Sequence, residues 1–140
     1  MSLSIRNQIP GTVVAVTAGE VMATVKVRLD GGQDLTAAVT LEAVEDLGLT
    51  AGSAVRALVK STEVALATGP VAGVSIRNQL PGTVRDVATG GAMATVKVAV
   101  DGGPDLTAAI TKDAVTDLGL TSGARVVALV KSTEVALATA

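Results

Sequence analysis

Two polar clusters stand out in this apolar chain, because together they offer hydroxyl, amide and cationic groups. The first, Ser-Ile-Arg-Asn-Gln, occurs at residues 4–8 and again at residues 75–79. The second, Lys-Ser-Thr-Glu, occurs at residues 60–63 and again at residues 131–134. Such groups donate hydrogen bonds, and a tetrahedral oxyanion has only acceptor oxygens to receive them. The combination predicts donor-lined sites for a small oxyanion.

Each cluster taken alone is also typical of ordinary solvated surface. The first resembles a polar arm next to an edge strand, and the second resembles an exposed turn. Their joint repetition favours a binding role over both of these interpretations. We expect Glu63 and Glu134 to contact a cation or a backbone amide, since a carboxylate repels a dianion.

The composition argues against catalysis and against direct metal ligation. The chain has no histidine and no cysteine, which are the commonest general base and the softest metal ligand. We therefore expect no enzyme activity, no cofactor and no direct protein–metal bond. The chain also has neither a secretory signal pattern nor an apolar run of about 18–20 residues, so we expect a cytoplasmic protein that does not enter the membrane.

The core composition and the net charge indicate which macromolecules the chain binds. Hydrophobic residues make up 49% of the chain, yet Phe, Tyr and Trp are absent. A core of small aliphatic side chains buries little area per residue, so we expect oligomerisation to add burial. The formal net charge of -2 and the lack of aromatic stacking groups argue against nucleic-acid binding.

The chain is an internal repeat. A shift of 71 positions aligns residues 1–69 with residues 72–140 without a gap, and roughly two-thirds of the pairs are identical. The junction has the Gly and Pro content of a short linker. We predict two domains, residues 1–68 and 74–140, joined by a linker at residues 69–73.

Each repeat has the pattern of a small β-domain. In the first copy we predict strands over residues 12–17, 21–30, 34–39, 54–59 and 64–67, the second with a clear period of two. Thr40 and Gly48 have the residue types of caps on a short helix between them. The predicted fold is all-β, with two tandem OB-like five-stranded barrels, each with one short helix.

The ordered set of motifs resembles the molbindin, or Mop, family of molybdate-binding domains. The resemblance rests on Ser-x-Arg-Asn-Gln, the following Gly-Thr-Val strand, the Leu-Gly-Leu helix end and the closing Lys-Ser-Thr-Glu-Val, and it covers the chain twice. It implies cytoplasmic binding of molybdate or tungstate at interfaces between domains or subunits. It also implies a homotrimer of tandem chains.

The resemblance further implies which side chains bind the oxyanion. Its principal ligands would be Ser4, Arg6, Lys60, Ser61, Ser75, Arg77, Lys131 and Ser132. Weaker correspondences add Asn7, Gln8, Thr62, Asn78, Gln79 and Thr133. Ile5 and Ile76 stand where Ala is expected in many members, which changes packing and leaves the donor chemistry intact.

Two functions remain open at this point. The first is storage and homeostasis of molybdenum by oxyanion binding. The second is a regulatory or sensory module that acts through a protein partner, since the chain has neither room for a helix-turn-helix nor a Walker A loop.

Overall fold

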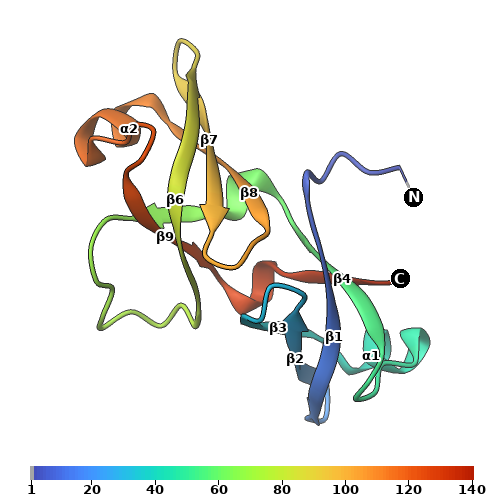
Figure 1. The fold of residues 1–140 in the computed structure, drawn as a ribbon. Helices are drawn as coiled ribbons and strands as arrows, with labels where there is room; N and C mark the ends of the chain where they lie inside the picture. The colour runs from blue at the N-terminus through green and yellow to red at the C-terminus, as the bar shows by residue number, and fades with distance from the viewer. Residues whose placement is uncertain (1) are drawn as a thin grey trace.

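The structure, a computed structural model that describes residues 2–140, contains two five-stranded antiparallel sheets with one α-helix each (Figure 1). The first repeat forms β1 (Asn7–Ala18), β2 (Met22–Leu29), β3 (Asp34–Thr40), α1 (Leu41–Leu47), β4 (Ala54–Val59), the 3-10 turn η1 (Ser61–Glu63) and β5 (Ala65–Ala67). The second forms β6 (Asn78–Thr89), β7 (Met93–Val100), β8 (Asp105–Thr111), α2 (Lys112–Leu118), β9 (Arg125–Val130), η2 (Ser132–Glu134) and β10 (Ala136–Thr139). The predicted all-β fold with one helix per half is confirmed.

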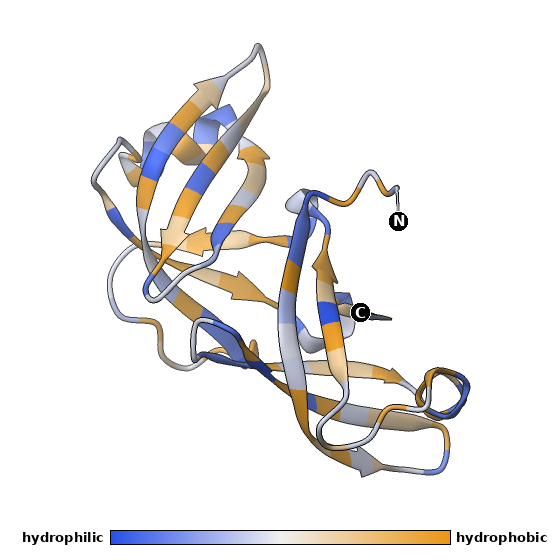
Figure 2. Cartoon of the chain, turned by 45° about the vertical axis from the view of Figure 1, so that its right-hand side comes forward, coloured by the Kyte–Doolittle hydropathy of each residue, from blue (hydrophilic) through white to orange (hydrophobic). Residues whose placement is uncertain are grey.

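Alternation of apolar and polar residues creates the strands. In β2 the buried residues are Ala23, Val25, Val27 and Leu29, and the residues between them are exposed. Figure 2 shows the same alternation along most strands. The first strand is longer than predicted, since β1 begins at Asn7 instead of residue 12. The amide-bearing residues of the first motif therefore belong to the sheet.

The helices begin and end where the cap residues predict. Thr40 accepts a hydrogen bond from the Ala43 backbone N–H (3.1 Å), and Gly48 ends α1 with φ of 63°. Thr111 and Gly119 do the same for α2. The helices are short and lie at the outer ends of the two halves (Figure 1).

The fifth strand of each sheet comes from the other repeat. The strand orders are β10-β4-β1-β2-β3 and β5-β9-β6-β7-β8. The chain therefore leaves β4, crosses to pair β5 with β9, and returns at its end to pair β10 with β4 (Figure 1). The sequence does not predict this exchange, because residues 57–68 and 128–139 are identical and either partner offers the same pairing.

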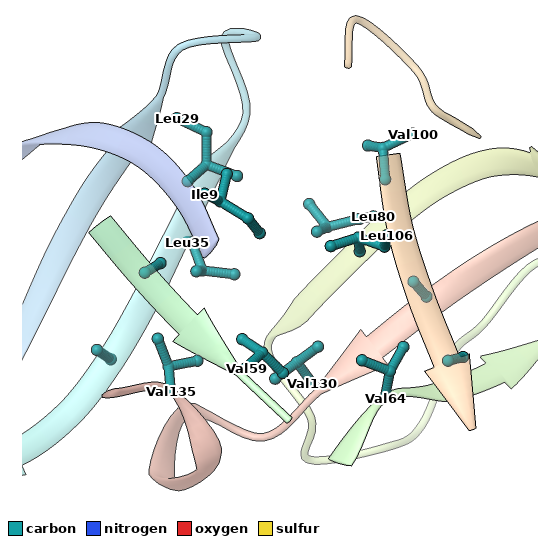
Figure 3. Close-up of a cluster of buried hydrophobic side chains, with 14 of the residues drawn as sticks. Ile9, Leu29, Leu35, Val59, Val64, Leu80, Val100, Leu106, Val130 and Val135 are labelled. Atoms are coloured by element: carbon teal, nitrogen blue, oxygen red, sulfur yellow. The ribbon is translucent and has the colours of Figure 1, made fainter. Parts of the chain in front are cut away.

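A single hydrophobic core runs through both halves. Val59 and Val130, the last residues of β4 and β9, are each 2% exposed and lie between the two groups of side chains (Figure 3). Val135, directly after η2, lies on the side of the first sheet, and Val64, directly after η1, lies on the side of the second. The crossing segments thus join the halves through buried contacts.

Candidate oxyanion site

In the second repeat the two predicted polar clusters lie next to each other. A pocket of about 320 Å³ is lined by Ser75, Ile76, Arg77, Lys131, Ser132 and Thr133. These residues come from two segments more than 50 positions apart in the chain. The structure therefore brings together the hydroxyl and cationic groups that the sequence analysis singled out.

Strand pairing explains why the clusters meet. In the second sheet Asn78, at the start of β6, pairs with Val130, at the end of β9. Because the two strands are antiparallel, the segment that precedes β6 and the turn that follows β9 leave the same end of the sheet. Arg77 and Lys131 are the first residues beyond this end.

The first repeat has the same register. Asn7 pairs with Val59, so Arg6 and Lys60 leave one end of the first sheet. Ser61 lies in η1, and its hydroxyl oxygen is buried with no hydrogen-bond partner among the described residues. A buried hydroxyl without a partner is costly, and a bound acceptor would satisfy it.

Within the described residues, the four cations of the clusters form no ion pair with a carboxylate. Within residues 2–140 the ion pairs are Arg28–Asp34, Arg85–Asp105 and Arg125–Asp101. None of them involves Arg6, Lys60, Arg77 or Lys131, all of which are exposed. Their charges are therefore available to an anion, and the hydroxyls beside them add neutral donors.

The glutamates of the clusters do not neutralise these cations. Glu63 and Glu134 line a second pocket of about 320 Å³ that Lys131 and Thr62 also border. Neither glutamate forms an ion pair in the part of the chain that the structure describes. The expectation that they contact a cation or a backbone amide stays a prediction.

The asparagines of the first motif are engaged elsewhere. Asn7 donates to the backbone carbonyl of Thr107 (2.9 Å) and accepts from its N–H (2.8 Å). Asn78 makes the same pair of bonds with Thr36, both at 2.8 Å. Both asparagines are 3% exposed. Their prediction as oxyanion ligands stays untested, but their amides already have partners.

The glutamines of the first motif form hydrogen bonds within the motif itself. Gln8 donates to the carbonyl of Ile5 (3.1 Å), and Gln79 donates to the carbonyl of Ile76 (3.1 Å). These bonds fold the segment before each first strand back toward the sheet. They orient the backbone that carries the preceding serine and arginine.

The sequence did not predict that each polar cluster contacts a strand of the opposite repeat. The turn η2 packs on β3 of the first repeat, and η1 packs on β8 of the second. No signal in the sequence could have identified Thr36 and Thr107, because they act through backbone atoms that every residue has.

The described residues contain no group of three or more His, Cys, Asp or Glu side chains that could hold a metal ion. In residues 2–140 no helix has the length and apolar character needed to cross a membrane. The hydroxyl and cationic side chains that line the pocket are hydrogen-bond donors, so the chemistry that they offer is hydrogen bonding to an anion.

Comparison with known protein families decides the classification. The family model described as the TOBE domain matches residues 3–66 and 74–137, which is most of the chain. The chain belongs to the TOBE-domain family. Both TOBE units contain one copy of each polar cluster.

Relatives of this tandem TOBE chain are molybdenum proteins. It is 38% identical over 138 residues to the molybdenum transport protein ModE of Azotobacter vinelandii, covering 99% of this chain and 51% of ModE. It is 40% identical over 136 residues to the molybdenum-pterin-binding protein MopB of Rhodobacter capsulatus, and this alignment covers 96% of this chain and 50% of MopB. The chain thus spans about half the length of these relatives.

A shorter relative matches a single repeat. The molybdenum-pterin-binding protein 3 of Clostridium pasteurianum is 45% identical over 64 residues, which is 46% of this chain and 94% of that protein. The resemblance to the Mop family seen in the sequence is confirmed.

A solved structure matches the whole TOBE pair. It is the cytoplasmic molybdate-binding protein ModG, crystallised with molybdate bound. The TM-score is 0.97, the identity is 42%, and the alignment covers 100% of both chains. The fold, including its two halves, is shared along the full length.

Proposed function

We propose that this protein binds molybdate or tungstate reversibly and serves in storage and homeostasis of the oxyanion in the cytoplasm. The observation that carries the proposal is the pocket where Ser75 and Arg77 lie next to Lys131 and Ser132. The likeness to ModG, which has molybdate bound in its crystal, supports the choice of oxyanion. The pocket has no general base or nucleophile pair, so we propose no reaction.

The donor set suits a tetrahedral dianion. Each charge-assisted hydrogen bond contributes about 1.5–3 kcal/mol net. Micromolar affinity needs about 8 kcal/mol, so several such bonds are required after the anion has lost its water shell. One cluster falls short of this number, whereas a site that combines both clusters reaches it.

We propose that the direct ligands in the second repeat are Ser75, Arg77, Lys131, Ser132 and Thr133. The equivalent ligands in the first repeat would be Ser4, Arg6, Lys60, Ser61 and Thr62. The partnerless hydroxyl of Ser61 supports the second set. The exposed, unpaired state of the four cations supports both sets.

We also propose a homotrimer as the binding-competent form. The core contains no aromatic residue, and several apolar side chains remain at the surface, among them Val21 (73% exposed), Met22 (46%) and Met93 (48%). Burial of such side chains in an oligomer supplies the missing hydrophobic stabilisation. A ligand that bridges subunits would then stabilise the assembly. Native mass spectrometry with and without molybdate tests this: three chains support it, and a monomer that binds molybdate fully refutes it.

A regulatory role is the second candidate. It is favoured by the alignment of 99% of this chain with about half of the transcriptional regulator ModE of Yersinia pestis, at 34% identity. If the chain acts as a sensor, molybdate must change its affinity for a defined protein partner. Pull-down with and without molybdate separates the roles: ligand-dependent capture of one partner supports sensing, and identical capture in both supports storage.

Isothermal titration calorimetry of the full chain tests the proposed function. We expect tight binding of molybdate and tungstate and much weaker binding of sulfate and phosphate. Protonated phosphate would leave its own hydrogen without an acceptor in a site that offers only donors. Molybdate affinity no better than that of sulfate would refute the proposal.

A further inference from the structure

We infer that Asn7 and Asn78 are positioning residues, each of which clamps the base of an oxyanion site to the third strand of the opposite repeat. This inference rests on the proposed function and assigns these residues a role different from that of direct ligands. It makes each site a joint product of both repeats.

The burial of these two side chains requires that their amides be hydrogen-bonded. Asn7 and Asn78 are the buried polar residues of the described chain, each 3% exposed in a core that is otherwise aliphatic. A buried amide is costly unless both its donor and its acceptor are satisfied. Each amide meets this condition through two hydrogen bonds to a single residue.

The residues that bind the two amides lie on strands at the edges of the sheets. Thr107 lies in β8 and Thr36 in β3, which are the terminal strands of the two sheet orders. A terminal strand has backbone N–H and C=O groups that no neighbouring strand satisfies. Each asparagine amide supplies one donor and one acceptor to this edge, as an additional strand would.

In the second repeat the clamped asparagine adjoins the oxyanion pocket. Asn78 directly follows Arg77, and its partner strand β3 is the strand on which η2 packs. The turn η2 contains Ser132 and Thr133, which line the same pocket as Arg77. The clamp therefore fixes both sides of the pocket against one strand of the first repeat. Asn7, Thr107, β8 and η1 form the same arrangement for the first site.

The test uses Asn78→Asp, because protonated aspartic acid has the shape and hydrogen-bond pattern of asparagine. Its hydroxyl can donate to the Thr36 carbonyl while its other oxygen accepts from the Thr36 N–H. The ionised form loses the donor and faces the carbonyl with a charge. Burial raises the pKa of such a carboxyl, so the clamp is intact at pH values below that raised pKa and is lost as the pH rises through it.

The readout is the ratio of molybdate affinities of the variant and the unmodified chain, measured by calorimetry at several pH values. The ratio cancels protonation of molybdate itself. We expect Asn78→Asp to bind about ten- to a hundredfold more weakly at pH values above the raised pKa of its carboxyl, as is typical when a group that orients ligands is removed. The ratio should return toward one as the pH falls.

A destabilised control separates positioning from general stability. Val96→Ala removes two methyl groups from a fully buried side chain of β7 and leaves the clamp intact. We expect this variant to keep near-normal molybdate affinity while folded. Equal losses of affinity in Val96→Ala and Asn78→Ala would overturn the inference, and so would normal molybdate affinity in Asn78→Ala.

A ligand-independent measurement keeps failure of the clamp distinct from failure of the proposed function. Hydrogen exchange of the Thr36 backbone amide should be slow in the unmodified chain and in Val96→Ala, but fast in Asn78→Ala. Fast exchange in the unmodified chain would overturn the clamp. Slow exchange together with absence of molybdate binding would instead refute the proposed function.

Discussion

At the scale of single residues, the chain uses its cations in two ways. Arg125 forms two hydrogen bonds with the Asp101 carboxylate, at 2.7 and 2.8 Å, on the surface of the second half. Within residues 2–140, Arg77 and Lys131 have no such partner, and they border a pocket that three hydroxyl side chains also line. A cation paired with a carboxylate contributes little to anion binding, whereas an unpaired one beside hydroxyl donors contributes fully.

The unpaired cations should dominate oxyanion affinity. We expect Arg77→Ala and Lys131→Ala each to weaken molybdate binding at the second site about ten- to a hundredfold, since a charge-assisted hydrogen bond contributes about 1.5–3 kcal/mol. Calorimetry of both variants checks this. Arg28→Ala, which removes a surface cation paired with Asp34, is the matched control and should bind normally. Equal losses in all three variants would indicate a non-specific charge effect.

Two of the paired cations, Arg28 and Arg125, instead lower the pKa of the aspartates with which they form ion pairs. The hydrogen bond from Arg125 lowers the pKa of Asp101, with a smaller Coulombic contribution from the same guanidinium. A lowered pKa in the folded state means that the pair stabilises the fold above the ordinary pKa of aspartate, and that this stabilisation is lost as the pH falls through the lowered value.

Replacement of this arginine gives a direct check. In Arg125→Ala the pKa of Asp101 should rise toward its ordinary value, which NMR titration of the side-chain carboxyl carbon can follow. Asp34, whose pKa is lowered by its hydrogen bond with Arg28, is the internal reference and should not change. An unchanged Asp101 pKa would contradict the assignment of the shift to Arg125.

Residue types in the sequence predict that the clusters bind an oxyanion, but they do not predict which partner each residue of a cluster contacts. Ser75 and Arg77 line the pocket with Lys131, as the hypothesis of a joint oxyanion site requires. Asn78 belongs to the same motif, yet its amide is bonded to the backbone of Thr36. Sequence alone cannot distinguish an oxyanion ligand from a residue that bonds to the backbone. Both need a hydrogen-bonding side chain, and they differ only in the direction in which that side chain points.

At the scale of elements, close contact between strands requires a glycine in β6. A Cβ atom at Gly82 would lie 2.5 Å from the Ala99 carbonyl oxygen of β7 and 2.9 Å from a Val98 methyl carbon. The backbone carbonyl cannot move away without disturbing the sheet that carries the site. Gly11 has the same role against β2 in the first half.

Gly82→Ala should therefore destabilise the fold by about 1–3 kcal/mol, as overpacking typically does. Denaturant unfolding followed by circular dichroism checks the value. Gly91→Ala is the matched control, because a Cβ atom at Gly91 would have no neighbour within 4 Å. Similar destabilisation in both variants would contradict the steric explanation.

Elements with local signals were predictable from sequence. The period of two in β2 and the Thr40 and Gly48 caps of α1 are decided by neighbouring residues, and the structure confirms them. The start of β1 at Asn7 was not predictable from sequence. The first residues of this strand are polar, and they belong to it because they pair with β4. That pairing depends on residues about 50 positions away.

At the scale of the whole molecule, the exchange of β5 and β10 makes the two repeats interdependent. Each half lacks a fifth strand without the other, and each polar turn rests on a strand of the other half. The internal repeat in the sequence predicts two units of similar fold. It could not predict the exchange, because identical sequence in the two copies allows either pairing.

Deletion of residues 136–140 tests this interdependence. It removes β10 and leaves the backbone groups of β4 unpaired at the edge of the first sheet. We expect a lower Tm, since ladder hydrogen bonds and the half-buried Leu137 and Ala138 are lost. Loss of protection of the β4 amides in hydrogen exchange, far along the sequence from the deletion, would locate the effect in the first half. Effects confined to β9 would contradict the observed strand order.

The measurement that tests the central claim most directly is anomalous diffraction at the molybdenum absorption edge, on crystals of the full chain grown with molybdate. The proposed function predicts an anomalous peak within hydrogen-bond reach of Arg77, Lys131 and Ser132, and an equivalent peak beside Arg6, Lys60 and Ser61. Crystals that show molybdenum only at other places on the protein, or at none, would contradict it.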